Sequence, residues 1–179
     1  FGGGGGSSSG SGVAVAANYA VAAIGSETSG SILSPSGKNS VVGLKPTIGA
    51  VSRSGVVPIS STLDTAGPMT KNVVDNAILL SAITGLDSKD SYSYASQSIR
   101  FQGLDTIQMK GKRLGLIRNF AKDSLMQVAI KIMEEAGATI ITFDPPEAAL
   151  KQFRKILDVD MKKDLPLYID SHGNRSLGL

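Results

Sequence analysis

The chain has 179 residues, 41% hydrophobic and 18% charged, a globular composition that argues against disorder of the whole. Its net charge of +3 is spread along the sequence rather than gathered into a basic face, so no nucleic-acid partner is expected. The absence of cysteine excludes disulfides, thiolate metal sites and a cysteine nucleophile, and the single histidine, His172, is expected in an exposed loop rather than as a base.

The N-terminal quarter alternates glycine-serine loops with short apolar segments. Residues 1–12 are almost entirely Gly and Ser, a composition typical of a linker, but the small apolar residues of 13–18 follow directly and predict a helix packed closely on a sheet. After an apolar segment at 20–24, residues 25–35 are polar and expected to be flexible. Residues 41–44 predict a short buried strand.

The middle of the chain contains one clear amphipathic segment. Pro58 confines the apolar residues 56–59 to a sheet edge or an irregular path. Apolar side chains at helical spacing predict a helix over 70–84, with Thr70 as its N-cap and Gly85 as its stop.

The second half shows a strand-helix-strand pattern after a polar stretch. Residues 87–109 are expected to form a surface loop. Strands are predicted at 113–117 and 139–143, and the helix between them, 124–136, is expected to open at Ser124. If the two strands share a sheet, the helical crossover makes them parallel.

The C-terminal region, 147–168, has a helical composition that Pro166 is expected to interrupt. The pattern as a whole predicts an α/β fold. We expect a single domain, in which 1–86 carries the serine loops and 110–179 continues the same domain beyond the 87–109 loop.

Two glycine-rich loops, 5–11 and 25–32, hold key serines 24 positions apart, Ser7 and Ser31. Glycine lets backbone N–H groups converge on a phosphate or on a developing oxyanion. Nucleotide binding is disfavoured, because no lysine follows either loop at phosphate-loop spacing and no strand precedes the first loop. Acyl transfer by serine fits better, since two serines and a neutral lysine can catalyse it without histidine.

Five linked blocks resemble the amidase signature family in order, spacing and residue type; they are 5–17, 24–32, 41–47, 51–58 and 64–69. The resemblance is close over 5–86 and looser over 110–175. It implies an amidase-signature core with a mixed, mostly parallel sheet flanked by helices. Ser9 and Ser29, together with Glu27-Thr28, look more like bacterial peptide amidases than like the subunits that amidate glutamyl-tRNA.

The resemblance also implies roles for individual residues. Ser31 would be the nucleophile that forms the acyl-enzyme, and Ser7, in a cis peptide linkage, would relay a proton between Ser31 and a lysine. Ser8 would support Ser7 by hydrogen bonding. The implied oxyanion hole consists of the backbone N–H groups of Thr28, Ser29, Gly30 and Ser31.

The family's lysine base lies upstream of the first serine loop, but no lysine precedes Ser7 in this sequence. Lys38 and Lys45 follow the nucleophile and are not assigned that role. The chain also stops soon after His172, where family members continue, so we expect the fold to be incomplete in this chain.

The expected function is hydrolysis of a carboxamide or amide bond through a Ser-Ser-Lys triad, on a small-molecule or peptide amide substrate. The alternative is a catalytically incomplete amidase fragment that acts as a scaffold or binding module. No cofactor and no metal are expected. The sequence also lacks a signal peptide and an apolar run of about 18 residues, so we expect a cytoplasmic protein without a membrane partner.

Overall fold

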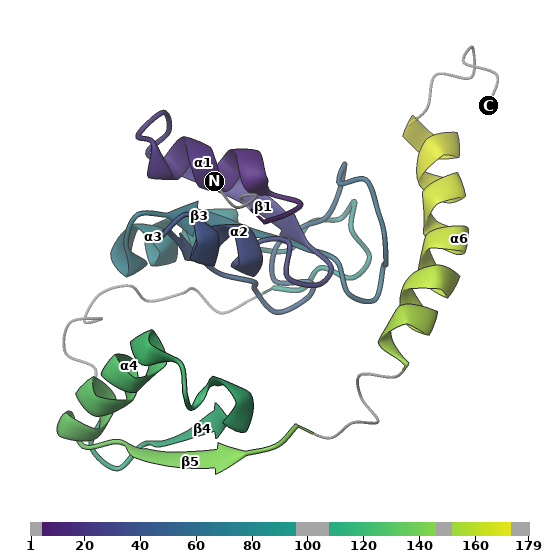
Figure 1. Ribbon diagram of the computed structural model, residues 1–179. Helices are drawn as coiled ribbons and strands as arrows, with labels where there is room; N and C mark the ends of the chain where they lie inside the picture. The colour runs from purple at the N-terminus through teal and green to yellow at the C-terminus, as the bar shows by residue number, and fades with distance from the viewer. Residues whose placement is uncertain (1–4, 96–107, 146–151, 173–179) are drawn as a thin grey trace. The chain divides into compact units, whose positions relative to one another are not determined.

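The computed structural model describes residues 5–95, 108–145 and 152–172 (Figure 1). The chain divides into two compact units. The first consists of Phe1–Gln102 together with Arg154–Leu179, and the second consists of Gly103–Phe153.

The first unit is built on a three-stranded antiparallel sheet in the order β1-β3-β2. The central strand β3, Thr65–Thr70, is buried at all six positions. It pairs with β1, Ala22–Glu27, along its full length, and with the short β2, Val42–Gly43. The backbone of Leu44 lies close against β3 at Gly67, where a side chain would not fit. A Cβ built on Gly67 would lie 2.2 Å from the carbonyl oxygen of Leu44.

Three helices accompany this sheet: α1 (Ser9–Ala16), α2 (Leu33–Lys38) and α3 (Val73–Ile83). The core is a cluster of small and medium aliphatic side chains, namely Val15, Ile32, Val41 and Met69. The close packing of α1 is visible at Gly12, where an added Cβ would lie 3.3 Å from Met69 Cε. The helix expected at 13–18 is therefore present and begins earlier, at Ser9.

Asn76 ties α3 to the sheet. It is only 3% exposed, and its Nδ2 donates to the carbonyl oxygens of Val42 and Pro68 and to Thr70 Oγ1, at 3.1–3.2 Å. A single buried amide thus connects this helix to both β2 and β3.

Several expectations for the first unit are wrong. Residues 25–35 are not a flexible stretch, because the chain forms β1 up to Glu27 and enters α2 at Leu33. The N-cap of α3 is Asn72 rather than Thr70, since Thr70 ends β3 and the Asn72 side chain accepts the Asp75 N–H at 2.9 Å. The strand expected at 41–44 is present but short, and 56–59 is irregular as expected.

The second unit contains the parallel pair β4, Arg113–Ile117, and β5, Thr139–Phe143, joined by α4, Ser124–Glu135. This confirms the strand-helix-strand prediction. The cap of α4 is Asp123 rather than Ser124, because the Asp123 carboxylate accepts the Met126 N–H at 2.9 Å. A short 3-10 turn, Arg118–Phe120, follows β4.

The α/β class is confirmed, but the expected predominance of parallel pairing holds only for β4 and β5. The larger of the described sheets is antiparallel, since its central strand β3 runs antiparallel to both β1 and β2.

Helix α6, Phe153–His172, runs through Pro166, so the expected interruption is wrong. Proline removes one backbone donor, but Asp164 and Tyr168 on either side of it make hydrogen bonds to Ser61 and Gly55 of the same unit. His172 is the last residue of this helix rather than part of a loop. Among the described residues, no helix is both long and apolar enough to cross a membrane.

The loop expected at 87–109 is described at 87–95 and 108–109, and 96–107 lie outside the described residues. Its described part is not purely a surface loop. Asp90 is 8% exposed and forms an ion pair with Arg53, and the Tyr94 N–H donates to the carbonyl of Gly49.

Replacing Asn76 by Asp should destabilise the first unit by about 3–5 kcal/mol at neutral pH, because an ionised carboxylate would face three oxygen acceptors without a proton to donate. The buried carboxyl should have a pKa above its unfolded value, so the penalty should be smallest below about pH 4 and grow as the pH rises. Unfolding followed by circular dichroism measures this. The same change at exposed Asn119 is the control, with an expected effect within about 0.5 kcal/mol; equal effects would contradict the role of Asn76.

Candidate active site

Ser7 and Ser31 lie together in the structure. Ser7 lies just before α1, and the Gly6–Ser7 peptide bond is cis, as the resemblance implied. Ser31 lies two residues before α2. Both line one cavity of about 30 Å³, roughly the size of one water molecule. The other lining residues are Ser26, Glu27, Thr28, Val56, Val57, Ile59 and Asp64.

Ser8 joins the two serine loops. Its backbone N–H donates to the carbonyl of Ser31 at 3.1 Å, and its Oγ both donates to the carbonyl and accepts from the N–H of Ser26. The hydrogen bonds of Ser8 therefore run to β1 and to the loop that carries Ser31 rather than to the Ser7 side chain. The expected support of Ser7 by Ser8 stays a prediction.

Glu27 organises the loop that carries Ser31. Its side chain is 4% exposed, and its carboxylate accepts the N–H of Gly30 on Oε1 at 2.7 Å. Oε2 accepts the N–H groups of Ile32 and Leu33 at 2.7 and 2.9 Å. Backbone donors on both sides of Ser31 thus converge on one buried carboxylate, which satisfies the donors at the start of α2.

The residues of the expected oxyanion hole form a tight turn between β1 and α2. Gly30 has φ +81°, a conformation that favours glycine. The Gly30 N–H already donates to Glu27, so in this arrangement it is engaged and would have to be shared to reach an oxyanion. The oxyanion hole at these four residues stays a prediction, in which the Gly30 N–H is the one already bonded to Glu27.

Asp64 lines the same cavity and binds the segments around it. It is 7% exposed; Oδ1 accepts the Thr28 hydroxyl at 2.5 Å, and Oδ2 accepts the N–H groups of Ile59 and Ser60 at 2.8 and 2.9 Å. Sequence reasoning assigned no role to Glu27 or Asp64, although both stand inside the matched blocks. One sequence signal could have pointed to them: an acidic residue beside a turn rich in small polar residues commonly accepts hydrogen bonds from the N–H groups of that turn.

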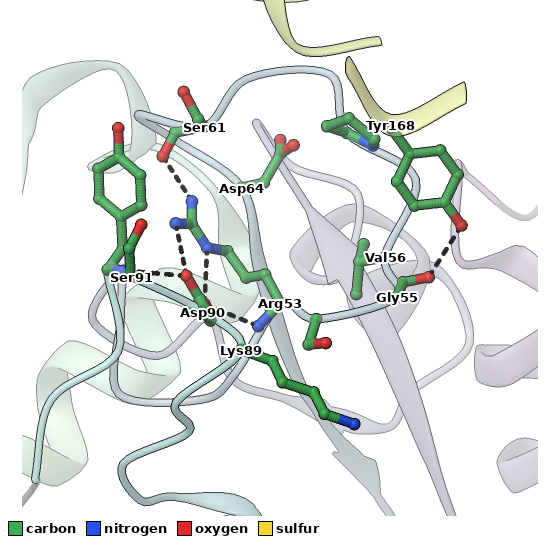
Figure 2. Close-up of a pocket in the computed structure, with 12 residues that line it drawn as sticks. Arg53, Gly55, Val56, Ser61, Asp64, Lys89, Asp90, Ser91 and Tyr168 are labelled. Carbon is green, nitrogen blue, oxygen red and sulfur yellow. Dashed lines mark hydrogen bonds and ion pairs between the residues drawn. The ribbon is translucent and has the colours of Figure 1, made fainter. Parts of the chain in front are cut away.

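A second cavity of about 270 Å³ adjoins the first and shares Val56 and Asp64 with it (Figure 2). Figure 2 shows Arg53 at its centre, bound to Asp90 and to the Ser61 carbonyl. Burial raises the pKa of Asp90, but hydrogen bonds from the Arg53 side chain and backbone outweigh it and leave the pKa below its usual value. The Arg53 guanidinium also lies 4.6 Å from the centre of the Tyr92 ring.

Neither Lys38 nor Lys45 is among the residues that line the serine cavity. Within the described part of the chain, no group of three or more His, Asp or Glu side chains is arranged to hold a metal ion.

A family model described as Amidase matches residues 4–165. The chain belongs to the amidase family. It is 40% identical over 167 residues to a glutamyl-tRNA(Gln) amidotransferase subunit of Ruegeria sp., covering 88% of this chain and 34% of that protein. It is 47% identical over 147 residues to a putative amidase of Arthroderma benhamiae, covering 73% of this chain and 24% of that protein.

Among solved structures, the native peptide amidase of Stenotrophomonas maltophilia matches with a TM-score of 0.87 and 40% identity, covering 95% of this chain and 37% of that one. The chain therefore spans only about a quarter to just over a third of the length of these relatives. The resemblance to peptide amidases and the amidase-signature fold are both shown by these matches.

Replacing Glu27 by Gln should loosen the Ser31 loop, because the amide retains one acceptor oxygen and presents an NH₂ group to at least one of the three N–H donors. We expect a loss of about 1–3 kcal/mol in the free energy of unfolding and faster hydrogen exchange at Gly30, Ile32 and Leu33. The exposed Glu134→Gln provides the matched control. Unaltered exchange at these three amides would show that Glu27 does not hold the loop.

Proposed function

We propose that the protein carrying this chain hydrolyses amide bonds, with Ser31 as the nucleophile. The observation that carries the proposal is that Ser7 and Ser31, from loops 24 residues apart, line one small cavity beside a turn of backbone donors. Nucleophile, relay hydroxyl and oxyanion donors are the parts that acyl transfer by serine needs.

In the proposed reaction, Ser31 Oγ attacks the carbonyl carbon of the amide while its proton passes to the hydroxyl of Ser7. Ser7 in turn gives its own proton to a base, which the family resemblance places on a lysine upstream of the first serine loop. Collapse of the tetrahedral intermediate breaks the C–N bond, and the protonated base returns the proton to the leaving nitrogen. Water then hydrolyses the acyl-enzyme by the same relay.

The developing oxyanion would be stabilised by backbone N–H groups of the turn Thr28, Ser29, Gly30 and Ser31. Because Gly30 is engaged by Glu27, we assign the main contribution to the other three. The bond from Thr28 to Asp64 supports this assignment, since it holds the first residue of the turn at the cavity wall.

A peptide or small-molecule amide is the proposed substrate class. The likeness to a peptide amidase supports it. Equal identity to an amidotransferase subunit leaves amide transfer to a second acceptor as the competing use of the same acyl-enzyme.

The alternative is a catalytically incomplete fragment that acts as a scaffold. It is favoured by the lack of a lysine among the described residues that line the serine cavity. Steady amide hydrolysis by the purified 179-residue chain, lost in Ser31→Ala, would remove this alternative. A gene sequence that encodes a lysine upstream of Ser7 would support the hydrolase.

In the full-length gene product, Ser31→Ala should abolish both release of ammonia or amine from amide substrates and formation of an acyl-enzyme detectable by mass. Ser7→Ala should lower kcat by about 10²–10⁴-fold without changing Tm, because it interrupts a proton relay at an exposed side chain. Ser81→Ala, within α3 and away from the serine cavity, controls for the substitution itself. Hydrolysis at the wild-type rate by Ser31→Ala would refute the assignment.

A further inference from the structure

One face of α6 is hydrogen-bonded to the loop that precedes β3. Asp160, Asp164 and Tyr168 follow one another at four-residue spacing and so lie on the same side of the helix. Asp160 accepts the Ser60 hydroxyl, Asp164 accepts the Ser61 N–H at 2.7 Å, and the Tyr168 hydroxyl donates to the Gly55 carbonyl at 3.3 Å. All three contacts reach one short segment of the loop.

Two of these contacts involve buried residues. Ser60 is fully buried, so its hydroxyl depends on Asp160 as its acceptor. Asp164 is only 9% exposed. The hydroxyls of Ser60 and then Thr62, with the Thr62 N–H, hold the pKa of Asp160 below its usual value, so this carboxylate is ionised at neutral pH.

The same loop segment continues to Asp64 and is hydrogen-bonded to it. The N–H groups of Leu63 and Asp64 donate to the Ser60 carbonyl, and the Asp64 carboxylate accepts the Ser60 N–H. Ser60 and Asp64 therefore form one closed turn. A shift of Ser60 would move Asp64 with it.

Asp64 links the Ser60–Asp64 turn to the proposed oxyanion turn, residues 28–31, by a hydrogen bond. Its other carboxylate oxygen accepts the Thr28 hydroxyl, and Asp64 and Thr28 line the cavity together with Ser7 and Ser31. A continuous series of hydrogen bonds thus runs from α6 through Ser60 and Asp64 to Thr28, three residues before the nucleophile.

We infer that Asp160 and Asp164 are positioning residues, which set the place of Thr28 and of the oxyanion turn by holding the Ser60–Asp64 turn. This inference rests on the proposed function. Neither aspartate lines the serine cavity, so their effect is on the rate of the chemical step rather than on substrate binding.

The test uses Asp160→Asn and Asp164→Asn in the full-length gene product, with Asp158→Asn as control, because Asp158 is an exposed aspartate on the same helix. We expect kcat for a small carboxamide to fall about 10–100-fold in the first two variants, with KM within about threefold of wild type. Asp158→Asn should leave both constants unchanged.

A double-mutant cycle separates positioning from general destabilisation. Thr28→Val removes the hydroxyl that bonds to Asp64 while retaining the side-chain shape. If Asp160 acts through Asp64 and Thr28, adding Asp160→Asn to Thr28→Val should lower kcat little further. Fully additive losses, or a lower Tm with unchanged kcat, would overturn the inference.

Hydrogen exchange distinguishes failure of this inference from failure of the proposed function. Asp160→Asn should raise exchange at Ile59, Ser60 and the 28–31 turn, whether or not the protein hydrolyses amides, and Asp158→Asn should not. If Ser31→Ala still hydrolyses amides while Asp160→Asn shows faster exchange, Ser31 is not the nucleophile but the hydrogen-bonded connection from α6 to Thr28 stands. Ser31-dependent hydrolysis with unchanged exchange and kcat would reject the link alone.

Discussion

The buried carboxylate of Glu27 is the constraint on which the site depends. It stands at the last position of β1, where the register of the sheet pairs it with Thr65, and it accepts three N–H groups of the turn that carries Ser31. A carboxylate can only accept, so each of its oxygens must be met by a donor when it is buried. The turn supplies those donors, and the sheet thereby determines where Ser31 lies.

Asp64 has a corresponding role on the neighbouring strand. It directly precedes β3, at the end of the sheet where β1 finishes, and its carboxylate joins the Thr28 hydroxyl to the backbone of Ile59 and Ser60. Two acidic residues at the ends of paired antiparallel strands thus anchor two loops. The Ser8 hydrogen bonds add the third loop, so three segments far apart in sequence meet at one cavity.

The sequence predicted those helices and strands whose local residue preferences match the secondary structure that the fold requires. The β4-α4-β5 unit has apolar strands around an amphipathic helix, and it was placed nearly to the residue. Strand β3 was missed because Gly67 and Pro68 both disfavour strands, and its position is set by neighbours on both sides. The continuation of α6 through Pro166 has a similar origin, since tertiary hydrogen bonds outweigh one lost backbone bond.

By itself the sequence determined the family, because order, spacing and residue type in five linked blocks resemble the amidase signature, and a family model matches residues 4–165. Only the tertiary structure decided which groups hold those serines in place. Glu27 accepts from N–H groups three to six positions away, but Asp64 accepts the Thr28 hydroxyl 36 positions away, and Asp160 and Asp164 accept from Ser60 and Ser61 at separations of 100 and 103 positions. No local pattern encodes these distant pairs. Their partners are backbone N–H groups and hydroxyls, which every segment carries, so folding alone selects which of them meet.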